Sequence, residues 1–366
     1  MVSQTCSPCL RDGILSKAWF IYLNLGMVFL SFTLLVYNLP SKDIHHRYVY
    51  NESLLVRPQR LPSGDIKYNI VVVTDLDHLS KNGNHWHSYL KRGFLVMDET
   101  ATKASVHWSR PDVVLKSDMA AKGRAMELSD LVVFDGQLLS VDDRTGLIYK
   151  IMGDQIVPWV FLNDGPGNTT KAFKAEWMTV KDDYLYIGGL GKEWTTASGE
   201  YVNDYPMWVK RVSFNGEVVH LNWTHNYKMI RKSLGIGFPA YLIHESCQWS
   251  KVHQKWFFLP RRVSEEPYDE NKDEFKGSNI VLMASENFAN VKKLEIGDRG
   301  DGTRGFSAFQ FVPNTNDDVI VALKSEEREG RSVASYISVF RISDRTLLMT
   351  ESRLEGAYKF EGLEFA

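Results

Sequence analysis

The sequence predicts an all-β protein, a five-bladed β-propeller preceded by a single N-terminal transmembrane helix. Three observations carry this prediction: an uncharged apolar stretch near the N-terminus, many short apolar segments separated by turns, and a polar signature that recurs along the chain. Aromatic residues make up 12% of the chain, which favours strands because aromatic side chains fit a pleated, half-buried surface. The 366 residues are enough for one large domain.

The apolar stretch is residues 19–39, WFIYLNLGMVFLSFTLLVYNL, which contains no charged residue. About 20 apolar residues cross a bilayer as a helix, whereas a cleavable signal peptide has a shorter apolar region, so we interpret the stretch as an uncleaved signal anchor. Residues 1–18 then form a cytosolic tail and residues 40–67 a luminal stem. Three glycosylation sequons, at Asn51, Asn168 and Asn222, all follow the span and favour a type II glycoprotein.

Charge and cysteine content exclude two classes of protein. The net charge of −2 gives no global field to attract nucleic acid, so we expect no nucleic-acid partner. Cys6 and Cys9 precede the apolar stretch and Cys247 stands alone downstream, so the chain has no disulfide framework and its core must hold the fold. A homodimer stays open, because Cys247 could form an intermolecular bridge, although a buried free thiol is the simpler interpretation.

From residue 68 onward one pattern recurs: a small or acidic polar residue, an apolar strand, a polar turn and a second apolar strand. Five copies lie roughly 50 to 70 residues apart, somewhat longer than a typical propeller blade. The fifth copy stops after one strand. A propeller closes its ring with strands from both chain ends, so we expect residues 68–366 to form five blades, one of them shared with residues 68–115. The copies open with Ser129 and Asp130, Glu176, Glu245, Ser307 and Glu361.

These opening residues predict a central calcium ion. If each lies on the innermost strand of its blade, the oxygens converge on the central channel, where unpaired carboxylates would repel one another. Ca²⁺ resolves this conflict because it takes 6–8 oxygen ligands at flexible geometry, and a set without His or Cys argues against zinc. The other interpretation is that each polar residue starts a strand and faces solvent.

Residues 68–366 resemble the calcium-activated nucleotidase or apyrase family. The resemblance rests on GRAMELSDLVVFDGQLLSVDDRTGLIYKI (123–151), FKAEWMTVKDDYLYIGGLGKEWTT (173–196), YLIHESCQWS (241–250), KWFFLPRR (255–262), GFSAFQFVPNT (305–315) and YKFEGLEF (358–365). It implies a five-bladed propeller that hydrolyses the terminal phosphate of nucleoside diphosphates, UDP and GDP preferred, and of some triphosphates. It also implies the calcium ligands that the repeat predicts: Ser129, Asp130, Glu176, Glu245, Ser307 and Glu361.

Phosphoanhydride hydrolysis needs an oriented water molecule, because most of the catalysis is positioning and electrostatics. Asp75 and Asp77 follow a strand in TDLD, and because they are two residues apart their side chains should face the same way. Asp142 follows another strand in VDDRTG. We expect these three carboxylates to orient the water, with Glu193 as a further candidate. The other interpretation is that each caps a turn.

The phosphate oxygens need cations. Arg261 and Arg262 should lie at a strand exit, and arginine binds phosphate with two parallel hydrogen bonds. Lys192 lies in GGLGKEW, where glycines let the backbone approach a ligand. Trp177 or Trp194 could stack on the nucleobase, although a tryptophan in a propeller usually belongs to the core.

Three hypotheses follow from the sequence. The first is a calcium-dependent nucleoside diphosphatase, anchored in the endoplasmic reticulum or Golgi membrane with its catalytic domain in the lumen. The second is a non-catalytic, calcium-stabilised propeller that acts as a protein-binding scaffold. The third is an apyrase secreted after cleavage in the stem. Phosphate release from nucleotides separates the first and third from the second.

Overall fold

The computed structural model describes residues 49–366 apart from residue 54, together with Tyr22 and Met27. The chain divides into two units, residues 1–49 and 50–366, and all the described strands belong to the second. Among the described residues, no helix is both long enough and apolar enough to span a bilayer. The predicted anchor at 19–39 lies almost wholly outside these residues, so the structure gives it no support.

Four antiparallel sheets of four strands follow one another along the chain. The first contains β7 (Leu128–Phe134), β8 (Gln137–Asp142), β9 (Leu147–Met152) and β10 (Gln155–Phe161). The second contains β11 (Trp177–Lys181), β12 (Tyr184–Gly188), β15 (Trp208–Val212) and β16 (Val218–Asn222). The third contains β17 (Tyr241–Ser250), β18 (Lys255–Ser264), β19 (Ile280–Ser285) and β20 (Val291–Glu295). The fourth contains β21 (Arg304–Phe311), β22 (Val319–Arg328), β23 (Arg331–Arg341) and β24 (Leu347–Arg353).

A seven-stranded sheet joins the two ends of the second unit. Its long strands are β2 (Ile66–Asp75) and β4 (His85–Met97), flanked by β1 (Gln59–Arg60), β3 (Lys81–Asn82), β5 (Ala104–Trp108) and β6 (Val113–Ser117). The last strand of the chain, β25 (Lys359–Glu364), pairs antiparallel with β2. The expected pairing of the C-terminal strand with the segment that opens the propeller is therefore confirmed.

Smaller elements connect these sheets. A hairpin of β13 (Trp194–Thr195) and β14 (Tyr201–Asn203) stands apart from them, and a single-helix insertion, α2 (Thr224–Ser233), follows β16. Three short 3-10 turns complete the described part of the unit: η1 (Asp77–Ser80), η2 (Tyr205–Met207) and η3 (Asp273–Phe275). Part of the predicted stem also belongs to this unit, because β1 pairs with β2 and the Tyr50 ring lies 5.4 Å from that of Phe134.

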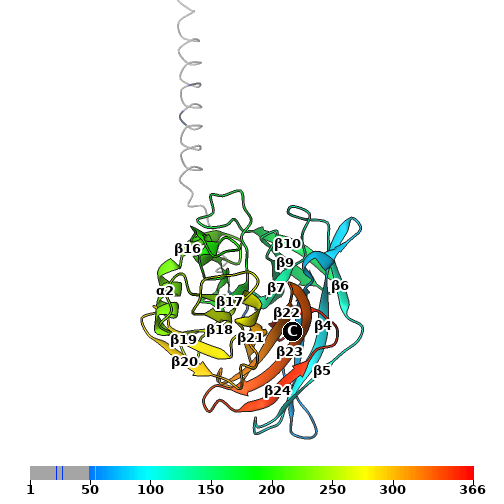
Figure 1. Cartoon of the computed structure of the whole chain (residues 1–366). Helices are drawn as coiled ribbons and strands as arrows, with labels where there is room; N and C mark the ends of the chain where they lie inside the picture. Colours follow the sequence, from blue (N-terminus) through cyan, green and yellow to red (C-terminus); the bar gives the residue numbers. More distant parts are fainter. Residues whose placement is uncertain (1–21, 23–26, 28–48, 54) are drawn as a thin grey trace, which may run out of the picture. The chain divides into compact units, whose positions relative to one another are not determined.

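The first strand of each four-stranded sheet lies on the inside of the unit. Contacts run from β7 to β11, from β11 to β17, from β17 to β21, from β21 to β25, and from β25 back to β7. In Figure 1 the outer strands β5, β16, β20 and β24 lie toward the rim. The arrangement is propeller-like, with four regular blades, and the fold is all-β as predicted.

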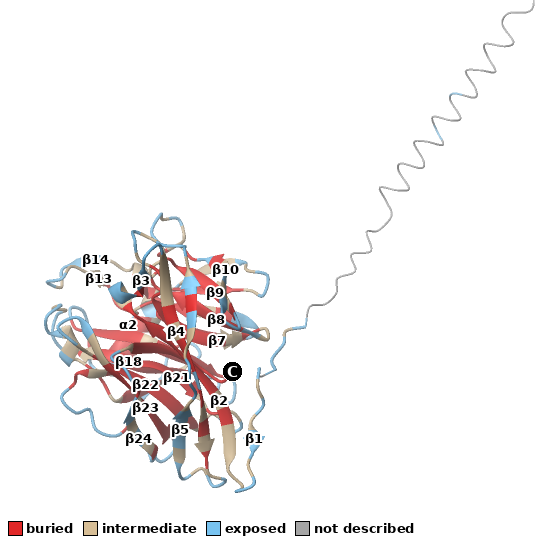
Figure 2. Ribbon diagram, turned by 90° about the vertical axis from the view of Figure 1, so that its right-hand side faces the viewer, coloured by how far each residue is buried: buried red, intermediate tan, exposed pale blue. Residues whose placement is uncertain are grey.

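Apolar side chains fill the space between neighbouring sheets, and Figure 2 shows that the buried residues lie along the strands while the connections are exposed. The cluster between the second and third sheets is rich in aromatic rings. Trp177 is fully buried there, and a Cβ at Gly188 would lie 2.0 Å from its ring. Trp177 therefore belongs to the core and is not available to a nucleobase.

A belt of polar side chains on the inner strands links the sheets by hydrogen bonds. The donors and acceptors come from adjacent inner strands, so a bond crosses each of the five contacts between them. The bonds are Met178 N–H to Asp130 Oδ2 (2.6 Å), Thr179 Oγ1 to Gln248 Oε1 (2.7 Å), Gln248 Nε2 to the Phe309 carbonyl (3.3 Å), Gln310 Nε2 to Glu364 Oε2 (3.2 Å) and Val133 N–H to Glu364 Oε2 (3.0 Å).

Candidate active site

The residues that open the sequence repeats lie at irregularities of the inner strands. The pairing register shifts at Ser129 in β7, at Ser307 in β21, at Glu361 in β25 and around Glu245 in β17. Glu176 immediately precedes β11. A β-bulge re-aims a side chain and is over-represented beside active sites. The recurring signature of the sequence therefore corresponds to a recurring break in the strand ladder.

Three glutamates from different sheets, Glu176, Glu245 and Glu361, interact in this region. Burial raises the pKa of Glu176 to about 8, with Lys174 opposing and Glu245 adding to the rise. Burial also raises the pKa of Glu361 well above its ordinary value, where Lys359 opposes and Glu245 adds. Glu245 therefore disfavours the ionised forms of Glu176 and Glu361, and a cation among the three would relieve this repulsion.

The predicted serine and aspartate ligands differ in their surroundings. The Ser129 hydroxyl is buried and has no hydrogen-bond partner among the described residues. Ser307 Oγ donates to the carbonyl of Phe360, 2.8 Å away and next to Glu361 in the chain. Asp130 belongs to the polar belt instead, because its two carboxylate oxygens accept the backbone N–H groups of Leu131 and Met178.

Ion pairs connect the glutamates to a larger network at the same end of the inner strands. It joins six cationic side chains to nine carboxylates, so negative charge is in excess when every carboxyl is ionised. The cations are Arg124, Arg144, Lys174, Arg261, Arg262 and Lys359; the carboxylates are Asp75, Asp77, Glu127, Asp143, Glu176, Glu245, Asp273, Glu327 and Glu361.

Within this network, Asp75, Asp77 and Glu127 each place a carboxylate oxygen within 4.8 Å of the others, which could hold a metal ion. The backbones of Asp75 and Glu127 form a β-bridge, which fixes their spacing. Burial acts to raise the pKa of Asp75, but the Lys359 ammonium, 2.6 Å from Oδ2 of Asp75, opposes this effect. The pKa of Asp75 therefore lies below its usual value. Burial raises the pKa of Glu127 to about 7, with Asp75 adding to the rise. An ionised aspartate thus lies beside a glutamate that can exchange a proton near neutral pH.

Glu127, Lys174 and Lys359 were not predicted from the sequence. Each lies two residues before an opening residue of the repeat, in ELS, KAE and KFE. Lys359 begins β25, whereas Lys174 and Glu127 lie just before β11 and β7, and all three belong to the ion-pair network that holds the glutamates. Lys174 Nζ is 2.7 Å from Glu176 Oε1 and Lys359 Nζ is 3.3 Å from Glu361 Oε1. That spacing was the signal that could have identified them.

Two predicted water-orienting carboxylates are engaged elsewhere. Asp142 Oδ2 accepts the N–H of Met126 at 2.8 Å, and its Oδ1 accepts the N–H of Arg144 at 2.9 Å. Glu193 forms two buried hydrogen bonds with Arg231, at 2.6 and 2.7 Å. The structure therefore brings Asp75 and Asp77 together at the network, whereas Asp142 holds a turn and Glu193 anchors a loop to α2.

The three predicted phosphate-binding cations also differ. Lys192 donates to the Glu193 carbonyl at 3.0 Å, and burial lowers its pKa to about 8. Arg261 is paired with three carboxylates. Arg262 is buried, and its Nη1 has no hydrogen-bond partner among the described residues. Of the three, Arg262 retains a free donor.

Comparison with known proteins now decides the family. A sequence model of the apyrase family matches residues 74–366. The chain belongs to the apyrase family. It is 52% identical to soluble calcium-activated nucleotidase 1 of Rattus norvegicus over 319 residues, which cover 86% of this chain and 78% of the relative. It is 49% identical to an apyrase of Caenorhabditis elegans over 331 residues, which cover 90% of this chain and 92% of the relative. It is 41% identical to an apyrase of Cimex lectularius over 304 residues, which cover 82% of this chain and 83% of the relative. The resemblance seen in the sequence is confirmed.

In this apyrase, a cavity of about 800 Å³ opens beside the ion-pair network. Its charged lining is strongly unbalanced, because five basic side chains face one carboxylate: Lys122, Arg124, Arg144, Lys171 and Lys174 against Asp143. Arg124, Arg144 and Lys174 belong to the network, so the cavity and the acidic cluster are continuous through them. Its volume lies in the range of small-molecule sites.

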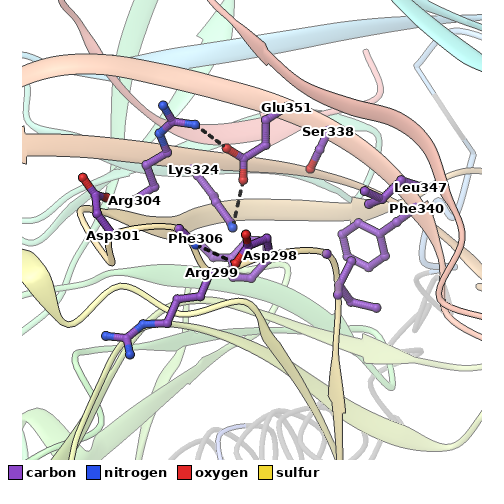
Figure 3. Close-up of a pocket in the computed structure, with 13 residues that line it drawn as sticks. Asp298, Arg299, Asp301, Arg304, Phe306, Lys324, Ser338, Phe340, Leu347 and Glu351 are labelled. Carbon is purple, nitrogen blue, oxygen red and sulfur yellow. Dashed lines mark hydrogen bonds and ion pairs between the residues drawn. The ribbon is translucent and has the colours of Figure 1, made fainter.

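A second cavity of the apyrase, about 400 Å³, lies between the loop at residues 296–301 and β21–β24 (Figure 3). Here Glu351 points toward both Arg304 and Lys324 and pairs with them at 2.8 and 2.9 Å. Asp298 and Asp301 add further negative charge at its edge. This cavity is neutral overall, because Arg299, Arg304 and Lys324 balance its three carboxylates, so it is the weaker candidate for an anionic substrate.

Proposed function

We propose that this member of the apyrase family is a nucleotidase, which hydrolyses the terminal phosphate of nucleoside diphosphates, with UDP and GDP preferred, and of some triphosphates. The observation that carries the proposal is the cationic cavity that opens beside a cluster of carboxylates, in which Asp75 and Glu127 are buried and Asp77 is half-buried. A nucleotide is an anion with a flat base, and its hydrolysis needs a group that orients water beside the terminal phosphorus, which a carboxylate can do. The family's sequence similarity supports the same activity.

We propose further that the seven-stranded sheet is a fifth blade. The cyclic contacts of β7, β11, β17, β21 and β25 support this count, and the polar belt crosses all five boundaries between these strands. Five inner strands would then surround one tunnel, and the ion-pair network would lie at its mouth.

The residues at the strand irregularities fit a calcium ion. Their ligand atoms are all oxygen, the Ser129 hydroxyl is buried without a partner among the described residues, and Glu245 repels both Glu176 and Glu361. Ser129, Glu176, Glu245, Ser307 and Glu361 would hold the ion, and Asp130 would remain in the belt. Bound calcium supplies positive charge that neutralises phosphate oxygens and holds the site together.

The chain's own residues account for substrate binding and proton transfer. Arg124, Arg144 and Lys174 lie where the cavity meets the network and would bind the phosphate oxygens. The Arg144 side chain is 33% exposed and pairs with Glu127 through Nε. Because a guanidinium has five N–H donors, Arg144 keeps further donors for phosphate oxygens. Glu127, whose pKa is about 7, would take the proton of the attacking water, and Asp75 would orient that water.

We retain the anchor and the luminal location as proposals. They rest on the apolar stretch at 19–39 and on the sequons, whose asparagines Asn51, Asn168 and Asn222 are all exposed. Release from the membrane by cleavage in the stem is the alternative. Cys247 is fully buried, so the homodimer that the sequence left open would not be bridged through it.

Phosphate release by the full chain in detergent tests the activity. We expect release from UDP, GDP, ADP and ATP with calcium, and none from UMP, which has no phosphoanhydride. A folded protein whose melting temperature rises with calcium but which turns over no nucleotide would contradict the proposal and favour the scaffold hypothesis.

A matched pair of variants tests the cavity. Arg144→Met removes a cation from the cationic cavity, and Arg304→Met removes an arginine of similar exposure from the cavity of Figure 3. We expect Arg144→Met to lower kcat/KM for UDP by about 10²-fold, as loss of one electrostatic donor does in other enzymes. Arg304→Met should leave kcat/KM within about twofold, and equal losses would contradict the assignment.

A further inference from the structure

The loop that joins β20 to β21, residues 296–303, carries the tripeptide Arg299-Gly300-Asp301. All three residues are exposed. Gly300 has a φ of +64°, and a Cβ at this position would meet nothing within 4 Å beyond its chain neighbours. A left-handed φ favours glycine, because other side chains are strained there. The tripeptide therefore forms an open turn at the surface, where loops on a rigid scaffold commonly bind partners.

The base of this loop is fixed to the segment around η3. Gly277 donates its N–H to the carbonyl of Gly302 at 2.7 Å. Arg299 donates from Nε to the carbonyl of Gly277 at 2.7 Å and from Nη2 to that of Phe275 at 3.1 Å. These bonds order the loop and set the direction of the guanidinium. A loop that is ordered in advance loses less conformational entropy when a partner binds.

Both charged side chains of the tripeptide keep unused polar atoms. A guanidinium has five N–H donors, and Arg299 uses two of them in the bonds to Gly277 and Phe275. Asp301 Oδ1 accepts the N–H and the hydroxyl of Thr303, at 3.1 and 2.6 Å. Among the described residues, Oδ2 has only an ion pair with Arg328 at 3.9 Å, which is weak because both side chains are more than half exposed. Donors and a carboxylate oxygen are thus available at the surface.

The two charges of the tripeptide lie apart. Figure 3 shows the guanidinium of Arg299 and the carboxylate of Asp301 pointing away from each other. A guanidinium pairs with a carboxylate through two parallel hydrogen bonds, and a carboxylate oxygen is a ligand for a hard divalent cation. A complementary surface therefore offers an acidic pocket on one side and a bound divalent cation on the other. This is the chemistry by which cell-surface adhesion receptors recognise Arg-Gly-Asp sequences.

We propose that the 296–303 loop is a docking site for an adhesion receptor that holds a divalent cation beside an acidic pocket. Asp301 completes the ligand shell of the receptor's cation, and Arg299 pairs with the receptor's carboxylates. The docking site rests on the proposed location of the propeller on the non-cytosolic side of the membrane. It does not depend on nucleotide hydrolysis, and it would hold the protein at a cell surface.

The test measures binding of the full chain in detergent to an immobilised integrin ectodomain that binds Arg-Gly-Asp peptides. Calcium and magnesium are present throughout, so that both proteins keep their metal ions. We expect saturable binding that the peptide GRGDS abolishes. The control peptide GRGES, whose acidic side chain is one methylene longer, should leave the binding unchanged.

Two matched variants locate the contact. Asp301→Glu keeps the charge but displaces the carboxylate, so we expect the Kd for the ectodomain to rise at least about tenfold, a typical effect of disturbing a metal ligand. Asp344→Glu is the control, because Asp344 is also exposed, accepts the N–H of Thr346 at 3.0 Å and pairs with Arg341. It should leave the Kd within about twofold. Both variants should keep the melting temperature of the wild type.

Three results would each overturn the docking site: no binding by the wild type, binding that GRGDS does not compete for, or wild-type affinity in Asp301→Glu. The proposed nucleotidase function is tested separately, because no nucleotide enters this assay. Receptor binding by a chain that releases no phosphate from UDP would reject that function alone. Phosphate release by a chain that does not bind the ectodomain would reject the docking site alone.

Discussion

Nη1 of Arg261 lies 2.9 Å from Oε1 of Glu361, although the two residues belong to different sheets and are 100 positions apart. The same guanidinium pairs with Glu245, and its Nη2 lies 2.6 Å from Glu327. One buried cation therefore joins β18 to the C-terminal strand and balances charge among the glutamates that we assign to calcium.

Replacement of Arg261 by methionine should destabilise the protein more strongly without calcium than with it. Without calcium, the buried carboxylates lose their partner, and breaking such a pair costs about 3–5 kcal/mol. Saturating calcium supplies alternative positive charge, so the loss should shrink. Urea unfolding with chelator and with calcium measures both values.

Arg60→Met is the control for Arg261→Met. Arg60 pairs with Glu99, and both side chains are more than 60% exposed, so its loss should cost at most about 1 kcal/mol in either condition. If Arg261→Met behaved like Arg60→Met, the guanidinium would not be balancing the glutamates.

The calcium assignment predicts a loss of affinity when a single ligand charge is removed. Glu176→Gln and Glu361→Gln should each raise the calcium dissociation constant at least about tenfold, since even residues that only support a metal ligand have effects of 10- to 100-fold. Calorimetric titration of each variant measures this directly. Glu286→Gln, which changes an exposed carboxylate that pairs with Lys181, should bind calcium as wild type does, and tight binding by Glu361→Gln would contradict the assignment.

The positions of the candidate ligands could be predicted from the sequence because the repeat recurs in phase. Ser129, Glu245, Ser307 and Glu361 share their place in the pattern, and the structure places all four at strand irregularities. The bulges themselves have no sequence signature here, so the pattern did not show that Asp130, the residue after Ser129, joins the belt. The pairing of β25 with β2 was predictable from the truncated last repeat.

The roles of other residues depended on partners that the sequence does not identify. Glu193 resembled a catalytic candidate because it follows a glycine-rich segment, but its partner Arg231 lies on a helix 38 positions later. Asp142 looked free because it ends a strand, but the following turn and Met126 direct three backbone N–H groups to its oxygens. Turn geometry and long-range ion pairs decided these cases.

Asp142 and Asp75 should therefore respond differently to amide substitution. In Asp142→Asn the side-chain amide would face the N–H of Met126 or Arg144, so the free energy of unfolding should fall by about 1–3 kcal/mol. The folded fraction should keep kcat within about threefold. Asp75→Asn should lower kcat of the folded enzyme by about 10²-fold or more, because it removes the carboxylate that orients the attacking water. Active-site titration combined with thermal unfolding checks both; a kcat loss in Asp142→Asn equal to that of Asp75→Asn would restore Asp142 as a catalytic candidate.

Glu364 gives the belt a pH dependence. Burial raises its pKa from 4.5 to about 7, although the N–H groups of Phe365 and Val133 oppose the rise. Because the folded state holds this proton more tightly than the unfolded state, stability should fall as pH rises from about 4.5 to about 7, by about 3 kcal/mol in total. Below that window the stability is at its full value, and above it the loss is complete.

Glu364→Gln should flatten this part of the pH profile, because glutamine does not titrate. Urea unfolding of wild type and variant at pH 5, 6, 7 and 8, at a fixed saturating calcium concentration, gives the difference. Parallel profiles for the two proteins would show that the Glu364 carboxyl keeps an ordinary pKa in the fold.

Carboxylates gathered from several strands serve, in our proposal, calcium-dependent nucleotide hydrolysis. The most direct measurement is the initial rate of phosphate release from UDP by the full chain, titrated with calcium and, separately, with magnesium after chelation. We expect a saturable rise with calcium, little with magnesium, and a curve shifted to higher calcium in Glu361→Gln. Equal rates with chelator and with calcium, or an unshifted curve in Glu361→Gln, would contradict the proposal.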